Sequence, residues 1–485
     1  MLVYREGRHF YYQSIFFGGM SMSRLDRDSL GEMELPDDLP YGIQTARAVT
    51  NFSISGQTVG EIPGFIAAIV EIKKAAAIAN GRIDGLPQGM VKAIVRAADA
   101  TLANYSAKEF PVDVYHGGGG TAANMNVNEV LARRASGEGL DVHPNTHVNM
   151  GQSTNDVVPA AMKITVYRLL LGLEAATRDL TRALARKERE FASIVKLART
   201  CLQDALPVTL GQQFSGYRAA VERQADELAR VRNACLHLPL GATAVGTEFG
   251  AFPGYKSAVY EELVRVTGIA FVPEENFFDG LQNADIWMAV SAVLKALAMT
   301  LSKIAADLRL MSSGPRGGLS EVELPAVQPG SSIMPGKVNP VIPEMVMQVH
   351  FRVLGNDLSI SRACEGELDL NVWESLILHC VAESAVLLRE VMPLFGALCI
   401  DGIKAHEARC RFDARMSLAL STTVATLFDY EMASGIAKEA ARDECSIEEV
   451  VVRRGLLSPN EAARLLDPFV LTQPALFGAL FSGKR

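Results

Sequence analysis

Hydrophobic residues recur along most of this chain at the spacing of α-helices. Between residues 57 and 108 this spacing predicts short helices with Gly81 as a stop, on a stripe formed by Ile62, Ile66, Ile69, Ile72 and Ala76. Beyond Pro159 a longer amphipathic pattern predicts a helix of many turns, on a stripe formed by Met162, Val166, Leu169, Leu173, Leu180 and Leu184. Further helices are predicted at about 211–236, 284–312, 341–362 and 374–400.

Other stretches interrupt this helical pattern. Residues 110–155 are dense in Gly, Asn and Pro, which favour turns and leave backbone groups available to a ligand. Val112–Tyr115 could form a strand, but no alternating series is long enough for a large sheet. After about Ala408 the pattern is again helical, with a break at 456–459.

The predicted helices indicate an all-α fold. The segment 284–312 is apolar nearly all round, so we expect it to be buried among other helices. Long helices with short connections are typical of a bundle, and a helix without a polar face suggests that association between subunits enlarges it. With 485 residues the chain exceeds the size of a single core, which predicts two or three domains or one long bundle with terminal caps.

Charge and composition narrow the possible partners. The net charge of −8 and a pI of about 5.6 argue against nucleic acid, whose phosphates require a basic face. The apolar stretch Ile286–Leu301 contains Lys295 and is shorter than the roughly 20 residues that cross a bilayer, so we expect a buried helix and no membrane span. No zinc pattern is formed by the eight histidines. The seven scattered cysteines contain no CxxC pair and predict a reduced, cytoplasmic protein.

Two loop-like segments combine glycines with short hydrogen-bond donors. In GGGGTAANMN, residues 117–126, the glycines permit close backbone approach and Thr121 could donate to an anion at a helix start, although a tight turn explains the composition equally well. In HVNMGQSTND, residues 147–156, Ser153, Thr154 and Asn155 precede the long helix. Capping alone could explain one of these three donors. Three consecutive donors exceed what one cap needs, so a ligand site and a purely structural role are equally open for the others.

A third segment, GSSIMPGKVNP at residues 330–340, places two serines near a single lysine. It does not match a phosphate-binding Walker loop, because five residues separate the glycines and Val338 follows the lysine. ATP binding is therefore not supported.

These three segments resemble the active-site regions of the aspartase/fumarase superfamily, in the same order, and the resemblance runs from about Arg24 to Ala475. The stretches NFSISG, FPVDVY, LGATAVGTE and PVIPE are more similar to the aspartate ammonia-lyase branch than to fumarate hydratases.

The resemblance implies a role for each site residue. Ser331 would be the base that removes a proton beside the β-carboxylate of the substrate, with its alkoxide stabilised by N–H donors and by Lys337. Thr121, Ser153, Thr154 and Ser332 would donate to the resulting aci-carboxylate, while Lys337 and Asn339 would hold the other carboxylate. Thr200 and Asn155 would line the amino-group side, and Glu344 matches a glutamate that orients a histidine in fumarases.

The chain departs from the family pattern at two positions. Ala122 replaces the serine that most relatives carry after the threonine, and Cys201 stands where relatives have histidine or glutamine. A thiol is a poor substitute for imidazole as an acid, which counts against fumarate hydratase because departing hydroxide must be protonated. Ammonia needs no such donor, so we expect conversion of L-aspartate to fumarate. The alternative is another leaving group, such as nitrite from nitrosuccinate.

The resemblance also implies a homotetramer whose central helices form a shared bundle, with active sites assembled from segments of different subunits. The expected division is an unstructured extension at 1–22, an N-terminal domain at 23–152, a central helical-bundle domain at 153–408 and a C-terminal domain at 409–485. No cofactor or metal is expected, and the partner is a small dicarboxylate. Some relatives, the lens crystallins, are structural proteins, but Ser331, Lys337 and Asn339 together favour an enzyme.

Overall fold

The computed structural model describes residues 22–137 and 139–481. The chain forms two compact units. The first unit contains Met1–Arg168, Ala234–Trp287 and Ile360–Ala382, and the second contains Leu169–Asn233, Met288–Ser359 and Glu383–Arg485. The proposed extension at 1–22 lies outside the described residues except for Met22. The division into domains at 23–152, 153–408 and 409–485 stays a prediction.

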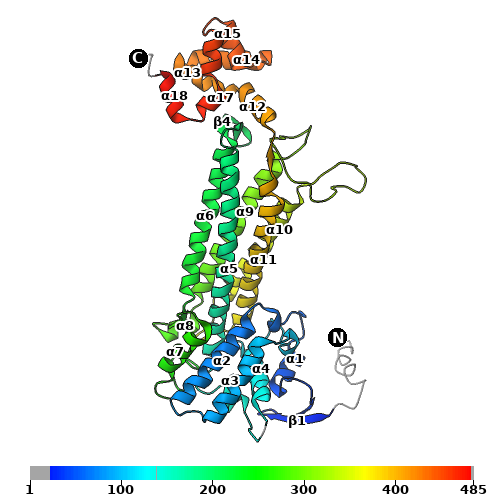
Figure 1. The fold of residues 1–485 in the computed structure, drawn as a ribbon, viewed down its shortest axis with the longest axis vertical. Coiled ribbons are helices and arrows are strands. Elements are labelled where there is room, and N and C mark those ends of the chain that lie inside the picture. Colours follow the sequence, from blue (N-terminus) through cyan, green and yellow to red (C-terminus); the bar gives the residue numbers. More distant parts are fainter. Residues whose placement is uncertain (1–21, 138, 482–485) are drawn as a thin grey trace, which may run out of the picture. The chain divides into compact units, whose positions relative to one another are not determined.

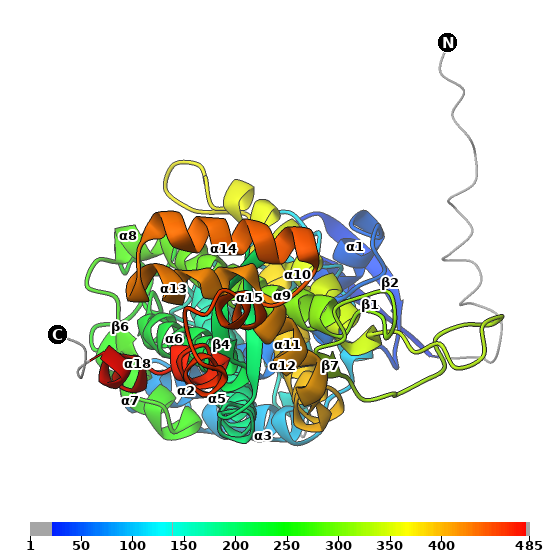
Figure 2. The ribbon, with the colours of Figure 1, turned by 90° about the horizontal axis from the view of Figure 1, so that it is seen from above.

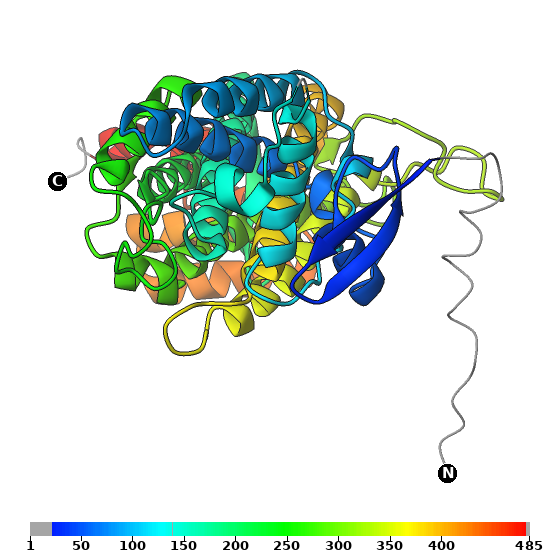
Figure 3. The ribbon, with the colours of Figure 1, turned by 90° about the horizontal axis from the view of Figure 1, so that it is seen from below.

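The first unit opens with an antiparallel hairpin of β1 (Ser23–Asp28) and β2 (Gly31–Pro36), seen in dark blue in Figure 3. Its helices are α1 (Ile43–Asn51), α2 (Phe65–Arg82), α3 (Gln88–Ala103), α4 (Thr121–Ala135), the start of α5 (Thr154–Glu190), α7 (Tyr255–Thr267), α8 (Phe277–Gln282) and the start of α11 (Glu374–Leu398). Figure 1 shows α2, α3 and α4 side by side. Helix α2 ends one residue beyond Gly81, the predicted stop. Short pieces complete the unit: 3-10 turns at Val59–Glu61 and Ala107–Glu109, a π-helical turn at Pro144–Val148, and the parallel pair β5 (His237–Leu238) and β6 (Val272–Pro273).

A buried carboxylate on α4 caps α1. Glu129 accepts the N–H groups of Gly42, Gln44 and Thr45 at 3.0, 2.9 and 3.0 Å, which satisfies donors that the first turn of a helix leaves unpaired. Burial raises the pKa of Glu129, and these hydrogen bonds oppose the rise. A Cβ at position 42 would lie 2.8 Å from the carboxylate and would push it away from these donors, so glycine favours this cap.

The second unit holds a bundle of long helices. Its members are the remainder of α5 and of α11 and nearly all of α6 (Leu210–Ala234), α9 (Asp285–Met311) and α10 (Val341–Ala363), which run side by side in Figure 1. Polar contacts link neighbouring helices within the apolar packing. The Tyr217 hydroxyl of α6 donates to Asp307 of α9 at 2.6 Å, and Asn356 Nδ2 of α10 donates to Ser384 of α11 at 3.0 Å.

The predicted helices and the all-α fold are confirmed. The helices expected at 211–236, 284–312, 341–362 and 374–400 are α6, α9, α10 and α11, with ends that differ by at most two residues. The long helix begins at Thr154, so Pro159 lies inside its second turn. Among the described residues every sheet has two strands. Val112–Tyr115 is not a strand, because only Asp113 forms a bridge, to Thr58.

Helix α9 is longer than its apolar stretch suggested. It has 27 residues, and among the described residues it is the single helix that is long and apolar enough to cross a membrane by length and composition. Its most apolar window is 56% buried within the chain, and Lys295 on it pairs with Asp357 at 2.7 Å. Both features are typical of a core helix. The expected absence of a membrane span stays a prediction.

The second unit also contains two antiparallel strand pairs, of which the first is a hairpin, and a set of short helices. The strands are β3 (Val195–Thr200) with β4 (Gln203–Thr209), and β7 (Val322–Glu323) with β8 (Lys404–Ala405). The short helices are α12 (Glu407–Met416), α13 (Ser421–Leu427), α14 (Tyr430–Asp443), α15 (Ile447–Arg453), α16 (Pro459–Leu465), α17 (Pro468–Leu471) and α18 (Pro474–Phe481), with 3-10 turns at Ile400–Gly402 and Leu418–Leu420. Figure 2 shows α12, α13, α14, α15 and α18 from above. The break predicted at 456–459 falls between α15 and α16 and is confirmed.

Candidate active site

The first predicted segment forms a glycine turn that starts α4. Gly118, Gly119 and Gly120 all have positive φ, and a Cβ at Gly120 would lie 2.8 Å from Val158, so the turn requires glycine there. Thr121 is the first residue of the helix. Its hydroxyl donates to the carbonyl oxygen of Gly118 at 2.8 Å. The expected ligand donor is therefore engaged by its own loop in this structure.

The second segment caps α5, and one of its three donors serves the cap. Ser153 Oγ accepts the N–H of Asn155 at 3.2 Å, while the Ser153 N–H donates to the Asp156 carboxylate at 2.9 Å. The Ser153 hydroxyl hydrogen stays available as a donor, because a hydroxyl both accepts and donates. The other oxygen of Asp156 accepts the N–H groups of Gly241 and Thr243 at 2.9 and 3.0 Å.

The remaining two donors of this segment have partners in distant parts of the first unit. Thr154 Oγ1 accepts a hydrogen bond from Asn124 Nδ2 of α4 at 3.1 Å. Asn155 Nδ2 donates to the carbonyl oxygen of Ala244 at 2.7 Å. The start of α5 is thus tied to α4 on one side and to the LGATAVGTE segment on the other.

A buried lysine lies beneath this segment. Lys73 of α2 is fully buried, and its Nζ donates to Asn149 Oδ1 at 2.8 Å and to Gln152 Oε1 at 3.0 Å. Burial lowers the pKa of Lys73 to about 7, opposed by the charge of Asp156. Burial also raises the pKa of Asp156 to about 6, opposed by its three backbone hydrogen bonds and by Lys73. A neutral amine has two N–H groups, which matches the two acceptors.

The third segment, in the second unit, surrounds a serine with backbone donors. Ser331 Oγ accepts the N–H groups of Ile333 and Met334 at 3.2 and 3.0 Å. Two N–H dipoles aimed at one hydroxyl oxygen favour negative charge on that oxygen.

The base of this loop is closed by one backbone and one side-chain hydrogen bond. The Gly330 N–H donates to the carbonyl oxygen of Lys337 at 2.8 Å, and Asn339 Nδ2 donates to the carbonyl oxygen of Gly330 at 2.8 Å. A Cβ at Gly330 would lie 2.6 Å from the Lys337 carbonyl oxygen, so the closure requires glycine. The side chains of Ser332 and Lys337 are exposed. Asn339 keeps its amide oxygen for a further contact.

Thr200 and Cys201 occupy the tip of the β3–β4 hairpin. Thr200 pairs with Gln203, so Cys201 and Leu202 form a two-residue turn, with φ angles of 53° and 60°. Such turns favour glycine and asparagine, and non-glycine residues in this conformation are strained. Cys201 is exposed. Glu344, in the first turn of α10, lies 3.7 Å from Arg309 Nη2, and this arginine is the partner that the structure assigns to it.

The predicted site residues fall into two groups. Thr121, Ser153, Thr154 and Asn155 belong to the first unit, and the others belong to the second: Thr200, Cys201, Ser331, Ser332, Lys337, Asn339 and Glu344. Sequence reasoning missed Lys73, Asn124 and Asp156. A signal for Lys73 was present, because it continues the apolar stripe of α2 one turn after Ile69.

Among residues 22–137 and 139–481, no group of three or more His, Cys, Asp or Glu side chains is arranged to hold a metal ion.

Comparison with known proteins places these segments in one family. A lyase family model matches residues 31–355, and a model of the fumarase C C-terminus matches residues 422–473. The chain is 41% identical over 462 residues to an aspartate ammonia-lyase of Helicobacter pylori, which covers 94% of this chain and 99% of that protein.

Solved structures agree with this match. A fumarate lyase:delta crystallin from Brucella melitensis superposes with a TM-score of 0.91 at 42% identity, over 93% of this chain and all of that chain. The class II fumarase from Schistosoma mansoni superposes with a TM-score of 0.89 at 31% identity, again over 93% of this chain and all of that one. The chain therefore belongs to the aspartase/fumarase superfamily of lyases.

Proposed function

We propose that this carbon–nitrogen lyase eliminates ammonia from L-aspartate and forms fumarate. The observation that carries the proposal is the pair of N–H groups, from Ile333 and Met334, that point at Ser331 Oγ. A free serine hydroxyl is too weak an acid to lose its proton near neutral pH, so a serine base needs such stabilisation. The similarity to aspartate ammonia-lyases over 94% of the chain supports the same assignment.

In the proposed mechanism the Ser331 alkoxide removes the proton from the carbon beside the β-carboxylate. The electron pair moves into that carboxylate and gives an aci-carboxylate with two negative charges. Hydroxyl donors from Ser153, Thr154 and Ser332 stabilise it, and Thr121 joins them when its hydroxyl turns from the Gly118 carbonyl oxygen to the substrate, at about 3 kcal/mol for each well-placed donor. The pair then returns to form the C=C bond as the C–N bond breaks on the opposite face, an anti-elimination.

The leaving amine explains why Cys201 suffices on that side of the site. The α-ammonium group departs as neutral ammonia and takes the C–N electron pair with it, so no acid is required. Asn155 and Thr200 line this side, and Lys337 with Asn339 binds the other carboxylate. Position 201 is a cysteine in this chain, so Glu344 has no histidine there to orient. This argues against the role that the resemblance to fumarases implies for Glu344.

The second candidate is release of nitrite from nitrosuccinate, and the observation that favours it is the altered leaving-group side, with Cys201 and Ala122. Fumarate hydratase is the less favoured third candidate. We would incubate the purified protein separately with L-aspartate, L-malate and nitrosuccinate and follow the ultraviolet absorbance of fumarate. Fumarate from L-aspartate is expected. Fumarate from nitrosuccinate alone would overturn the ammonia-lyase proposal and keep the Ser331 mechanism.

We further propose that the active protein is a cytoplasmic homotetramer, with each site built from segments of different subunits. Helix α10 exposes Phe351, Leu354 and Leu358 at 58%, 41% and 67%, at helical spacing on one face of the isolated chain. Such a stripe supports burial against other copies. Light scattering during gel filtration is expected to give four times the 52.3 kDa chain mass, and a monomeric active protein would contradict this assembly.

A further inference from the structure

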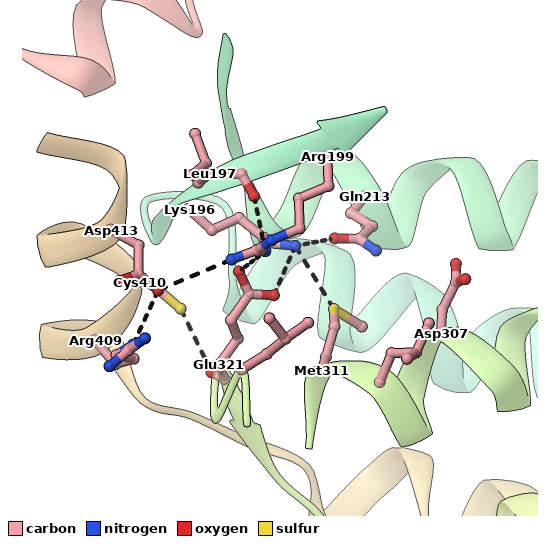
Figure 4. A network of polar contacts seen from close by, with 12 residues as sticks. Lys196, Leu197, Arg199, Gln213, Asp307, Met311, Glu321, Arg409, Cys410 and Asp413 are labelled. Carbon is pink, nitrogen blue, oxygen red and sulfur yellow. Dashed lines mark hydrogen bonds and ion pairs between the residues drawn. The ribbon is translucent and has the colours of Figure 1, made fainter. Parts of the chain in front are cut away.

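A fully buried carboxylate lies at the base of the hairpin that carries Thr200 and Cys201. The side chain of Glu321, the residue directly before β7, is 0% exposed. Its carboxylate forms ion pairs with two cationic side chains of β3, as Figure 4 shows. Lys196 Nζ lies 2.9 Å from one oxygen, and Arg199 Nη1 lies 2.6 Å from the other. One buried carboxylate therefore holds both cations of this strand.

The same cluster joins four parts of the second unit. Lys196 Nζ also donates to Gln213 of α6 at 2.9 Å, and Arg199 Nη2 lies 3.9 Å from Asp413 of α12. The backbone of Glu321 takes part as well, because its carbonyl oxygen accepts the His406 N–H at 2.9 Å. Cys410 Sγ of α12 donates to the same oxygen at 3.4 Å (Figure 4). The strand end is thus fixed relative to α6, α12 and the chain that leads to the Ser331 loop.

The tip of the hairpin depends on this base. Cys201 and Leu202 adopt strained left-handed backbone angles, yet both side chains are exposed, and Leu202 is 73% exposed. Little packing at the tip holds them there, so the constraint has to come from the strands below. Arg199 is the residue next to Thr200, and the register of β3 shifts between Leu197 and Arg199, where Glu321 binds.

We propose that Glu321 is a positioning residue that acts through Arg199 and Lys196 to place Thr200 and Cys201 on the leaving-group side of the active site. This inference rests on the proposed function, because the proposed function is what assigns Thr200 and Cys201 to the leaving-group side. Without the carboxylate, the buried Lys196 and the half-buried Arg199 would lie near each other without their shared counter-charge, and their repulsion would displace the strand end. Shifts of about 1 Å in a catalytic group can lower a rate by about a hundredfold.

The test separates leaving-group chemistry from carboxylate binding. Glu321→Gln keeps the shape of the side chain and removes its charge. We expect kcat for fumarate formation to fall at least about tenfold. The Kd of succinate, a dicarboxylate without a leaving group, should change less than about twofold, because it probes only the carboxylate contacts. Glu321→Asp, which keeps the charge, should recover part of kcat.

A matched control removes another carboxylate of the same unit. Asp357 of α10 binds Ser291 and Lys295 of α9, both at 2.7 Å, and is remote in sequence from the hairpin. Asp357→Asn should lower the free energy of unfolding. It should not lower kcat for fumarate formation selectively over the binding of succinate. The proposal is wrong if Glu321→Gln keeps the wild-type kcat, or if both variants change kcat and succinate affinity in parallel.

Two further measurements keep the outcome clear. If Glu321→Gln does not fold, Arg199→Met removes the cation through which Glu321 acts on Thr200, and an unchanged kcat would overturn the proposal. Labelling of the Cys201 thiol by a disulfide reagent, with Cys201→Ala as the blank, needs no substrate. The labelling rate should differ between wild type and Glu321→Gln, because the thiol would lie in a different local environment, and an unchanged rate would contradict the positioning role. If wild-type protein releases no fumarate from L-aspartate, the proposed function fails, while this thiol measurement still decides the role of Glu321.

Discussion

Asn124 Nδ2 lies 3.1 Å from Thr154 Oγ1, so a buried asparagine of α4 is hydrogen-bonded to the first residue of α5. Asn124→Ala should lower the free energy of unfolding by about 1–3 kcal/mol, because it removes a buried side chain that donates to the half-buried Thr154 and Asn149. It should also raise KM for the dicarboxylate, since Thr154 loses the contact that orients its hydroxyl. Urea unfolding and steady-state kinetics measure the two effects.

Asn126 offers the matched control for this prediction. It is buried on the same helix, but its Nδ2 donates to the Glu109 carbonyl oxygen at 3.0 Å, away from Thr154. Asn126→Ala should destabilise the protein comparably and leave KM unchanged. Equal changes in KM for both variants would show that general loosening of α4, and not the Thr154 contact, is responsible.

Ser331→Ala should abolish fumarate formation while the oligomer stays intact, because the proposed base is lost. Ser332→Ala should be less severe, with kcat lowered about 10²–10³-fold as for removal of one oxyanion donor. Initial rates with L-aspartate and gel filtration of both variants provide the measurement. Residual turnover by Ser331→Ala at the level of Ser332→Ala would refute the base assignment.

Lys73 predicts a specific dependence of stability on pH. Its folded-state pKa of about 7 lies below the ordinary 10.5, so between these values the unfolded chain holds more protons and stability rises with pH. From pH 7 to pH 9 the lysine should contribute about 2 kcal/mol to the free energy of unfolding.

Asp156 affects the free energy of unfolding at lower pH than Lys73 does. Its pKa is raised from 3.8 to about 6, so its contribution falls as pH rises between those values and is complete by pH 7. Urea unfolding at pH 7 and pH 9 should therefore show a larger gain for the wild type than for Lys73→Met. An identical gain in both proteins would mean that Lys73 stays charged in the folded state.

Cys201→His should confer or increase fumarate formation from L-malate, because an imidazole can protonate departing hydroxide and a thiol cannot do so effectively. Histidine tolerates the positive φ of this turn better than most side chains. Cys201→Ser, similar in size, controls for loss of the thiol. If Cys201→His and Cys201→Ser respond alike with L-malate, residue 201 does not determine the leaving group.

The bundle could be predicted almost completely. Helix α10 was expected at 341–362 and spans Val341–Ala363, because its apolar spacing and the preceding Pro340 are local features. The three loop segments were equally visible, since glycines and short polar residues stand out between apolar helices. The partners of the site residues were not visible in the sequence. Glu344, for example, pairs with Arg309 of α9.

By itself the sequence determined the helices, the loops between them and the family to which they belong, because periodicity and motifs are encoded over a few consecutive residues. Only the tertiary structure decided which groups support the loops. Lys73 is 76 positions from Asn149, and Glu321 is 122 positions from Arg199. Contacts at such separations, and the pKa of a lysine buried by them, arise from packing of the whole chain around these groups.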